Sequence, residues 1–279
     1  GAVLLGRPTE PHIETVNDLD GFVANFWRAV AHDPDAVAAA ADWPVNENDL
    51  TARHIWLVGQ RDGLTARLEG DPDYFDAKIA GWWVWGMACW IGSGFCSGEG
   101  PWGSVDGQRV HLGNAGQGVN RKRVHLGDAG RGVNRQRGLH EWMRDLCDRL
   151  SRVRVCCGDW TRVLGSSPTT GLGLTGVVLD PPYATDVRDK DLYAKDSGTL
   201  DADVWAWAVV HGDDPLLRIA VCGYEDGRTL PPGWTAATWK ASKGYASQAH
   251  GEANNNRELE RIWFSPHCLA DKTQAELFE

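Results

Sequence analysis

The order of apolar and polar positions divides the chain into short strands and amphipathic helices. Apolar side chains recur every third or fourth position in the segments that predict helices, namely 19–30, 35–41, 46–80 with a break at 70–72, 139–150 and 201–210. Apolar runs bounded by glycine, asparagine or aspartate predict strands at 12–16, 152–157, 176–179 and 216–222, and a pair at 235–240 and 258–265. Strands that alternate with helices indicate an α/β fold with a mainly parallel, doubly wound sheet.

Two stretches interrupt this pattern. Residues 80–103 are rich in tryptophan and glycine and show no clean period. The segment RVHLGNAGQGVNRK at 109–122 is followed at once by RVHLGDAGRGVNRQ, so a tandem repeat with a period of 14 residues fills 109–136. Two copies are too few for a solenoid, and their composition predicts paired loops or a hairpin-like arm. Either a duplication in a tolerant surface loop or a DNA-contacting element explains the repeat.

The most informative motif follows the apolar run 176–179. It reads Asp180-Pro181-Pro182-Tyr183, and the two prolines end the strand and stiffen the turn. A rigid loop thus holds a carboxylate and an aromatic ring at the carboxyl end of a strand, where open α/β sheets bind ligands. The alternative is a proline-rich turn after a core strand.

This loop resembles the catalytic motif of S-adenosylmethionine-dependent amino methyltransferases, above all the DNA N6-adenine enzymes of the Dam type. The resemblance implies that Asp180 and the carbonyl of Pro181 accept hydrogen bonds from the two N–H groups of an adenine amino group. Those hydrogen bonds would localise the nitrogen lone pair and aim it at the methyl group, while Tyr183 stacks on the base. Positioning and electrostatics then supply the catalysis, with Pro182 part of the rigid loop.

The same resemblance implies a Rossmann-like fold that binds S-adenosylmethionine. Asp18, after the first predicted strand, matches the acidic residue that holds the cofactor's ribose, and a helix N-cap is the alternative. Asp159 matches a position near the cofactor's adenine, and a simple turn is the alternative. Asp180 would also lie beside the cofactor.

The chain departs from the family at its first residues. Gly1 and the four residues after it resemble the last glycine of the family's cofactor loop and the helix that follows. The expectation is therefore an enzyme truncated within its glycine-rich loop, and this chain would be an inactive fragment if that loop is essential.

The resemblance also predicts the order of the parts. Residues 1–48 and 139–279 would form the methyltransferase core, and 49–138 an inserted target-recognition region containing the repeat at 109–136. That region includes seven basic residues and a single acidic one between positions 109 and 137, which predicts contacts to DNA phosphates. The basic residues are Arg109, Arg121, Lys122, Arg123, Arg131, Arg135 and Arg137.

Composition changes this picture in few places. The net charge of −10 is unlike an average DNA-binding protein, but the basic insert allows double-stranded DNA as the partner. Seven cysteines, without a CxxC pair, indicate reduced thiols and neither a disulfide framework nor a metal site. No apolar run is long enough for a membrane helix, and no signal peptide is visible. These features predict a cytoplasmic enzyme, bacterial or phage-encoded.

Other functions stay open at this stage. The fold would also suit methylation of cytosine N4, of an RNA base or of a protein amide, although aspartate as the first residue of the motif is typical of the adenine enzymes. A non-catalytic DNA-binding remnant is the alternative from a different class. The sequence does not say whether a cognate restriction nuclease exists.

Overall fold

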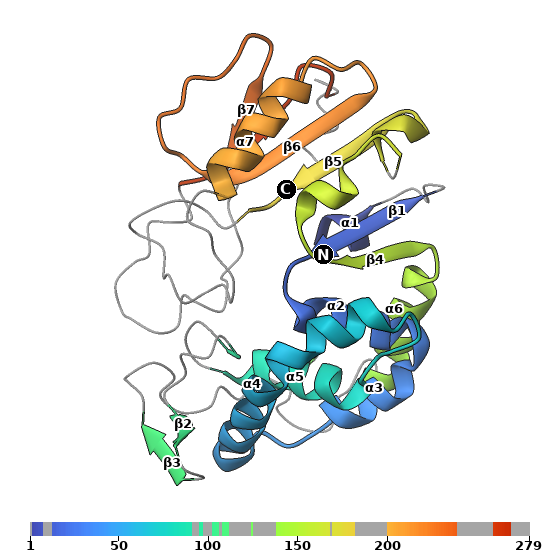
Figure 1. Cartoon of the computed structure of the whole chain (residues 1–279), viewed down its shortest axis with the longest axis vertical. Coiled ribbons are helices and arrows are strands. Elements are labelled where there is room, and N and C mark those ends of the chain that lie inside the picture. Colours follow the sequence, from blue (N-terminus) through green and yellow to red (C-terminus); the bar gives the residue numbers. More distant parts are fainter. Residues whose placement is uncertain are drawn as a thin grey trace. The chain divides into compact units, whose positions relative to one another are not determined.

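The protein is a mixed α/β protein made of two compact units, residues 1–162 and 163–279 (Figure 1). The computed structural model describes residues 2–7, 13–90, 95–96, 102–105, 108–111, 124, 138–167, 169–181, 200–238 and 259–268, with the backbone alone at 102–105 and 108–111. No helix in these ranges is both long and apolar enough to cross a bilayer.

The first unit combines helices with a parallel pair of strands. Its helices are α1 (Ala2–Gly6), α2 (Gly21–His32), α3 (Pro34–Ala41), α4 (Glu47–Gly70), α5 (Ala77–Cys89) and α6 (Leu139–Leu150). Strand β1 (Glu14–Asp18) pairs in parallel with β4 (Val153–Cys157), and α2 packs against both strands. A separate antiparallel pair joins β2 (Trp102–Val105) to β3 (Gln108–His111). The 3-10 helix η2 (Trp160–Val163) follows β4.

Short polar side chains begin four of these helices. The side chain of Asp20 accepts a hydrogen bond from the backbone N–H of Phe22 at the start of α2. Asp33, Asn46 and Asp76 cap α3, α4 and α5 in the same way. Each cap satisfies a backbone donor that has no partner inside its helix.

The predicted helices at 35–41 and 139–150 are confirmed as α3 and α6, and the break predicted at 70–72 falls at the end of α4.

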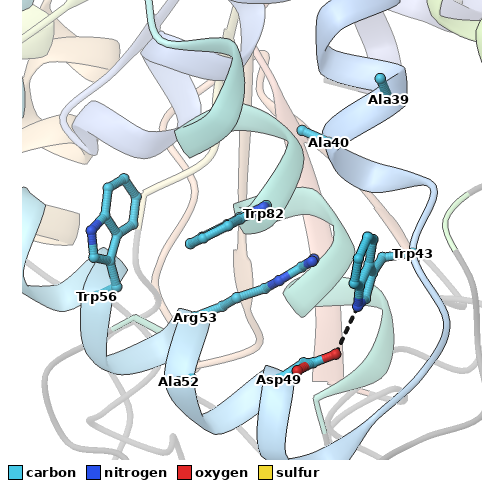
Figure 2. Close-up of a pocket in the computed structure, with 8 residues that line it drawn as sticks. All are labelled: Ala39, Ala40, Trp43, Asp49, Ala52, Arg53, Trp56 and Trp82. Atoms are coloured by element: carbon cyan, nitrogen blue, oxygen red, sulfur yellow. Dashed lines mark hydrogen bonds between the residues drawn. The ribbon is translucent and has the colours of Figure 1, made fainter.

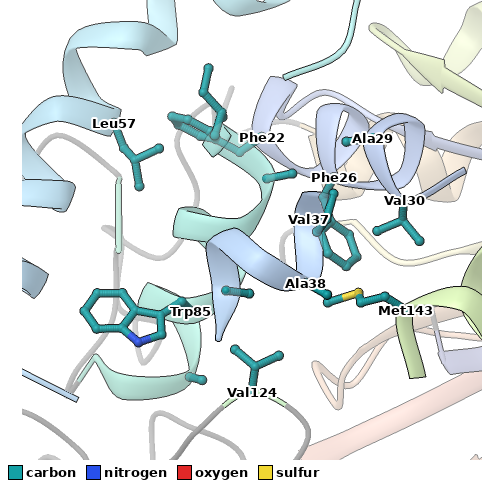
Figure 3. Close-up of a cluster of buried hydrophobic side chains, with 14 of the residues drawn as sticks. Phe22, Phe26, Ala29, Val30, Val37, Ala38, Leu57, Trp85, Val124 and Met143 are labelled. Carbon is teal, nitrogen blue, oxygen red and sulfur yellow. The ribbon is translucent and has the colours of Figure 1, made fainter. Parts of the chain in front are cut away.

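Five helices of the first unit share one hydrophobic core (Figure 3). Phe22, Phe26 and Val30 lie one turn apart on α2 and are all buried, as helical periodicity requires. They meet side chains from the other helices, among them Val37, Leu57, Trp85 and Met143. Helices α4 and α5, which lie within the range predicted as an insert, thus pack into the same core as α2 and α3.

The sequence after residue 80 shows no helical period, yet α5 continues as a regular helix to Cys89. Gly81 and Trp85 are buried on one side of α5, and Ala80, Gly86 and Cys89 are buried on others. A helix that is buried on most sides is apolar all round, so its sequence carries no amphipathic period.

The second unit is built on a four-stranded sheet with the order β5-β6-β8-β7. Its strands are β5 (Thr175–Leu179), β6 (Leu217–Tyr224), β7 (Thr235–Thr238) and β8 (Glu260–Phe264), with the 3-10 helix η3 (Thr170–Leu172) before them. Strands β5 and β6 are parallel, whereas β8 runs antiparallel to both of its neighbours. The last two predicted strands are confirmed and pair with each other. This sheet is mixed, so the prediction of a mainly parallel sheet is wrong for the second unit, because β8 returns antiparallel between β6 and β7. Helix α7 (Leu200–His211) lies against β6 (Figure 1).

Candidate functional site

The structure brings two of the predicted cofactor residues to one edge of the β1–β4 pair. Asp18 is the last residue of β1 and stands opposite Cys157, the last residue of β4. The N–H of Gly158 donates to the carbonyl of Asp18 at 3.0 Å, and the side chain of Asn17 donates to the carbonyl of Gly158 at 3.0 Å. Asp159 follows directly. The carboxyl ends of both strands are therefore tied together, with a carboxylate on each.

The Asp18 carboxylate is partly buried and organises the start of α2. Its Oδ1 accepts a hydrogen bond from the backbone N–H of Asp20 at 2.9 Å. Burial is the main cause that raises the pKa of Asp18 above its ordinary value, and hydrogen bonds from backbone N–H groups oppose that rise. The residue that caps α2 is Asp20, so the N-cap interpretation of Asp18 is wrong.

Asp159 is an exposed carboxylate that opens the 3-10 helix η2. It accepts hydrogen bonds from the backbone N–H of Thr161 at 2.9 Å and from the Thr161 hydroxyl. These two hydrogen bonds hold the pKa of Asp159 below its ordinary value, with the hydroxyl as the largest cause. The turn interpretation therefore describes its local contacts, two residues beyond the end of β4.

The turn between β4 and Asp159 requires glycine. Gly158 has a φ of 133°, a backbone conformation that side chains disfavour. A Cβ there would also lie 2.3 Å from the Nη1 atom of Arg162, which donates a hydrogen bond to the carbonyl of Cys157 at 2.9 Å. The sequence pattern marks Gly158 only as the end of a strand and indicates no role for Asn17. A polar residue just before the acidic one was the signal available for Asn17.

In the second unit, Asp180 lies where the motif predicts, directly after β5. Val177 and Leu179 are buried in that strand, Asp180 is exposed and Pro181 is buried. Because β5 runs parallel to β6, Asp180 stands at the carboxyl end of a parallel pair. Asp180 thus lies at the surface while Pro181 packs inward.

The partly buried thiol of Cys222 on β6 lies within the field of this carboxylate. Val221, the residue before Cys222, pairs with Leu179, the residue before Asp180. Burial raises the pKa of Cys222 to about 12, and the charges of Asp180 and Glu260 add to the rise. Cys222 is therefore a neutral thiol at ordinary pH and no nucleophile.

The other predicted site residues are not described at side-chain level. Arg109 lies in β3, where the backbone alone is described. The remaining ones lie outside the described residues, namely Gly1, Arg121, Lys122, Arg123, Arg131, Arg135, Arg137, Pro182 and Tyr183. Asp18 and Asp159 belong to the first unit and Asp180 to the second. Where side chains are described, no group of three or more His, Cys, Asp or Glu residues has the arrangement of a metal site.

The chain matches no model of a protein family, and no curated protein sequence matches it significantly.

Proposed function

We propose that this chain is a DNA methyltransferase with a Rossmann-like core, which transfers a methyl group from S-adenosylmethionine to the N6 atom of a flipped adenine. The observation that carries the proposal is the Asp180-Pro181-Pro182-Tyr183 motif directly after β5. Strand β5 pairs in parallel with β6, so the motif begins at the edge where α/β sheets bind ligands.

The cofactor half of the proposal rests on the β1–β4 edge. An ionised carboxylate accepts hydrogen bonds from hydroxyl groups, and the partly buried Asp18 carboxylate suits a ribose in this respect. Asp159 lies two residues beyond the end of β4, the strand that pairs in parallel with β1. These residues fit the sugar and base of S-adenosylmethionine, which supplies the electrophilic methyl group when bound.

The chemistry asked of Asp180 is to orient a weak nucleophile. The lone pair of an adenine amino group is delocalised into the ring, so the nitrogen attacks poorly. When the Asp180 carboxylate and the Pro181 carbonyl accept hydrogen bonds from the two N–H groups of the adenine amino nitrogen, its lone pair is localised and directed at the methyl carbon. Bound S-adenosylmethionine would supply the methyl group, with the electron pair of its S–C bond going to sulfur, and the methylated nitrogen would release its surplus proton to water. Tyr183 would hold the ring by stacking, so catalysis comes from placement and fixed charge.

Double-stranded DNA is the proposed partner. An adenine inside a duplex cannot reach Asp180, so it must be extruded from the stack. The basic residues between positions 109 and 137 would hold phosphates, and the predicted target-recognition region at 49–138 would read base edges.

The proposal is tested by removing the Asp180 carboxylate. We expect Asp180→Ala to lower the rate of methyl transfer to DNA by roughly 100-fold or more, the scale seen when a positioned polar group is lost. Its affinity for DNA should stay within twofold, because phosphate contacts lie elsewhere. Asp213→Ala, which removes another exposed carboxylate of the same unit, is the matched control and should keep the rate. A wild-type rate in Asp180→Ala would refute the mechanism.

A further inference from the structure

The open cavity of the first unit is lined by groups that already contact one another (Figure 2). It has a volume of about 560 Å³ and lies between α3, α4 and α5. The Asp49 Oδ2 atom accepts a hydrogen bond from the indole N–H of Trp43 at 2.7 Å. The rings of Trp56 and Trp82 meet edge to face, with their centres 5.1 Å apart. A buried cation in the second unit leads further, because it lies at the sheet edge that also holds Asp180.

This cation is Arg228, in the loop that follows β6. Its side chain is only 13% exposed. The guanidinium carbon lies 4.5 Å from the ring centre of Trp205 on α7 and 4.3 Å from that of Trp263 on β8. A charge enclosed in this way is costly unless acceptors match its donors. The contacts of Arg228 therefore show which parts of the fold it holds together.

Two carboxylates from different elements accept hydrogen bonds from Arg228. Its Nε and Nη2 atoms donate to Asp226, in the same loop, at 2.9 and 2.7 Å. Nη2 also donates to the Oδ2 atom of Asp201 at 3.1 Å, and the Asp201 side chain is 12% exposed. The hydrogen bonds from Arg228 hold the pKa of the Asp226 carboxyl below its ordinary value. Since Asp201 stands in the first turn of α7, Arg228 ties the start of that helix to the loop after β6.

The start of α7 lies at the edge where β5 and β6 end. The helix follows β5 in the chain, packs against β6 and is joined to the beginning of β6 by a short turn. Because β5 and β6 are parallel, α7 must run back along the sheet and begin at their carboxyl ends. Asp180 follows β5 at that edge, and the chain from Asp180 to Leu200 carries Pro182 and Tyr183 of the proposed motif.

We propose that Arg228 is a positioning residue for methyl transfer, which fixes the start of α7 and with it the far end of the segment that begins at Asp180. Its effect on the reaction rests on the proposed function, whereas the tie to α7 does not. A segment held at both ends has fewer conformations than one held at a single end. Placement of the reacting groups governs the rate of the proposed reaction, so release of α7 should lower kcat more than affinity.

The first test measures the tie without relying on activity. Asp201→Asn removes the carboxylate charge that Arg228 meets on α7 and keeps Asp226 in place. We expect the backbone amides of residues 200–206 to exchange hydrogen about five times faster or more, with those of β6 unchanged, as measured by mass spectrometry. Asp203→Asn is the matched control, since it makes the same change at an exposed position of the same turn. Wild-type exchange at 200–206 in Asp201→Asn would overturn the proposal.

The second test measures the consequence in the full chain. We expect Asp201→Asn and Arg228→Met to lower kcat about tenfold or more, while KM for DNA and Kd for S-adenosylmethionine stay within twofold. Arg228→Lys keeps a cation between the tryptophan rings and should recover part of the lost rate. Arg218→Met makes the same change near the start of β6 and should keep kcat.

The outcomes separate this inference from the proposed function. Unchanged kcat in variants whose α7 amides exchange faster would overturn the positioning role, and so would a loss confined to KM or Kd. A wild-type chain that methylates no DNA would instead refute the proposed function. The exchange measurement would then still decide whether Arg228 holds the start of α7.

Discussion

Asp18 and Asp20 stand two positions apart, yet the fold gives them different environments. Asp20 accepts from the N–H of Phe22 and begins α2, whereas Asp18 ends β1 and lies at the edge of the parallel pair. Residue types alone did not separate these roles, because aspartate suits both a cap and a ligand site. The structure separates them because the N–H of Phe22 donates to Asp20, whereas the N–H of Asp20 donates to Asp18.

This difference leads to a prediction for cofactor binding. Asp18→Asn should lower the affinity for S-adenosylmethionine about tenfold or more, because a charged acceptor for the ribose becomes a neutral amide. Asp20→Ala should instead lower the free energy of unfolding by about 1 kcal/mol, the usual value of a helix cap. Titration calorimetry and urea unfolding measure the two effects. Unchanged cofactor affinity in Asp18→Asn would assign the ribose to another residue.

A second prediction concerns the buried imidazole of His54. Its side chain is 2% exposed, it stacks on Trp90 with ring centres 4.9 Å apart, and its Nδ1 atom accepts from the N–H of Cys96. Burial lowers the pKa of His54 to about 4, and the charge of Arg61 adds to this effect. The ordinary value, which applies in the unfolded chain, is about 6.5.

The sign follows from where the proton binds. Between pH 6.5 and 4 the unfolded chain takes up the proton and the folded chain does not. The contribution of His54 to the free energy of unfolding is therefore fully present above pH 6.5 and is lost as the pH decreases towards 4. His54 alone should lower the free energy of unfolding by about 2 kcal/mol at pH 5 relative to pH 7. Urea unfolding at both pH values checks this for the wild type and His54→Gln. The variant should lose most of the difference, and an equal difference in both proteins would contradict the assignment.

At the scale of elements, sequence patterns were most reliable where one face of an element is buried and the other is wet. Helix α6 buries Leu139, Met143, Leu146 and Leu150 at helical spacing, and its bounds coincide with the predicted segment. Strand β6 alternates buried and partly buried positions from end to end, as a strand with one covered face does. Helix α5 lacked such a signal because burial on most sides removes the polar face.

Close packing of α5 against α3 gives a prediction for these helices. A Cβ on Gly81 would lie 2.4 Å from the Cβ of Ala40 and 2.7 Å from the carbonyl oxygen of Val37. Gly81→Ala should therefore lower the free energy of unfolding by about 1 to 3 kcal/mol, because the helices must move apart. Gly59→Ala on α4 is the matched control, since a Cβ there meets nothing within 4 Å. It should raise stability by up to about 1 kcal/mol, and a stabilised Gly81→Ala protein would disprove the close contact.

At the scale of the whole molecule, the places of the acidic residues along the chain were easier to predict than the assembly of the strands that precede them. The sequence located Asp18, Asp159 and Asp180 at strand ends because each follows a short apolar run that stops at a polar turn. It could not say which strands pair, since pairing depends on contacts distant in sequence. The structure shows that β1 pairs in parallel with β4 and that β5 pairs in parallel with β6. The two pairs belong to different compact units.

The predicted target-recognition region illustrates the same limit. Leu57 and Trp85 lie within 49–138, yet they are buried beside Phe22 and Val37 from the segment before it. Changes of composition along the chain mark where a sequence alters in character. They do not mark where a core ends, because a core collects side chains from any part of the chain.

Modification-sensitive sequencing of host DNA is the decisive measurement for the proposed methylation of adenine. A methylation-deficient bacterium would express the wild-type chain, and a parallel culture would express its Asp180→Ala variant. We expect N6-methyladenine at one defined sequence motif in the wild-type culture and its loss in the Asp180→Ala culture. If the wild-type chain folds and binds S-adenosylmethionine but leaves adenine unmarked, DNA adenine is not the methyl acceptor.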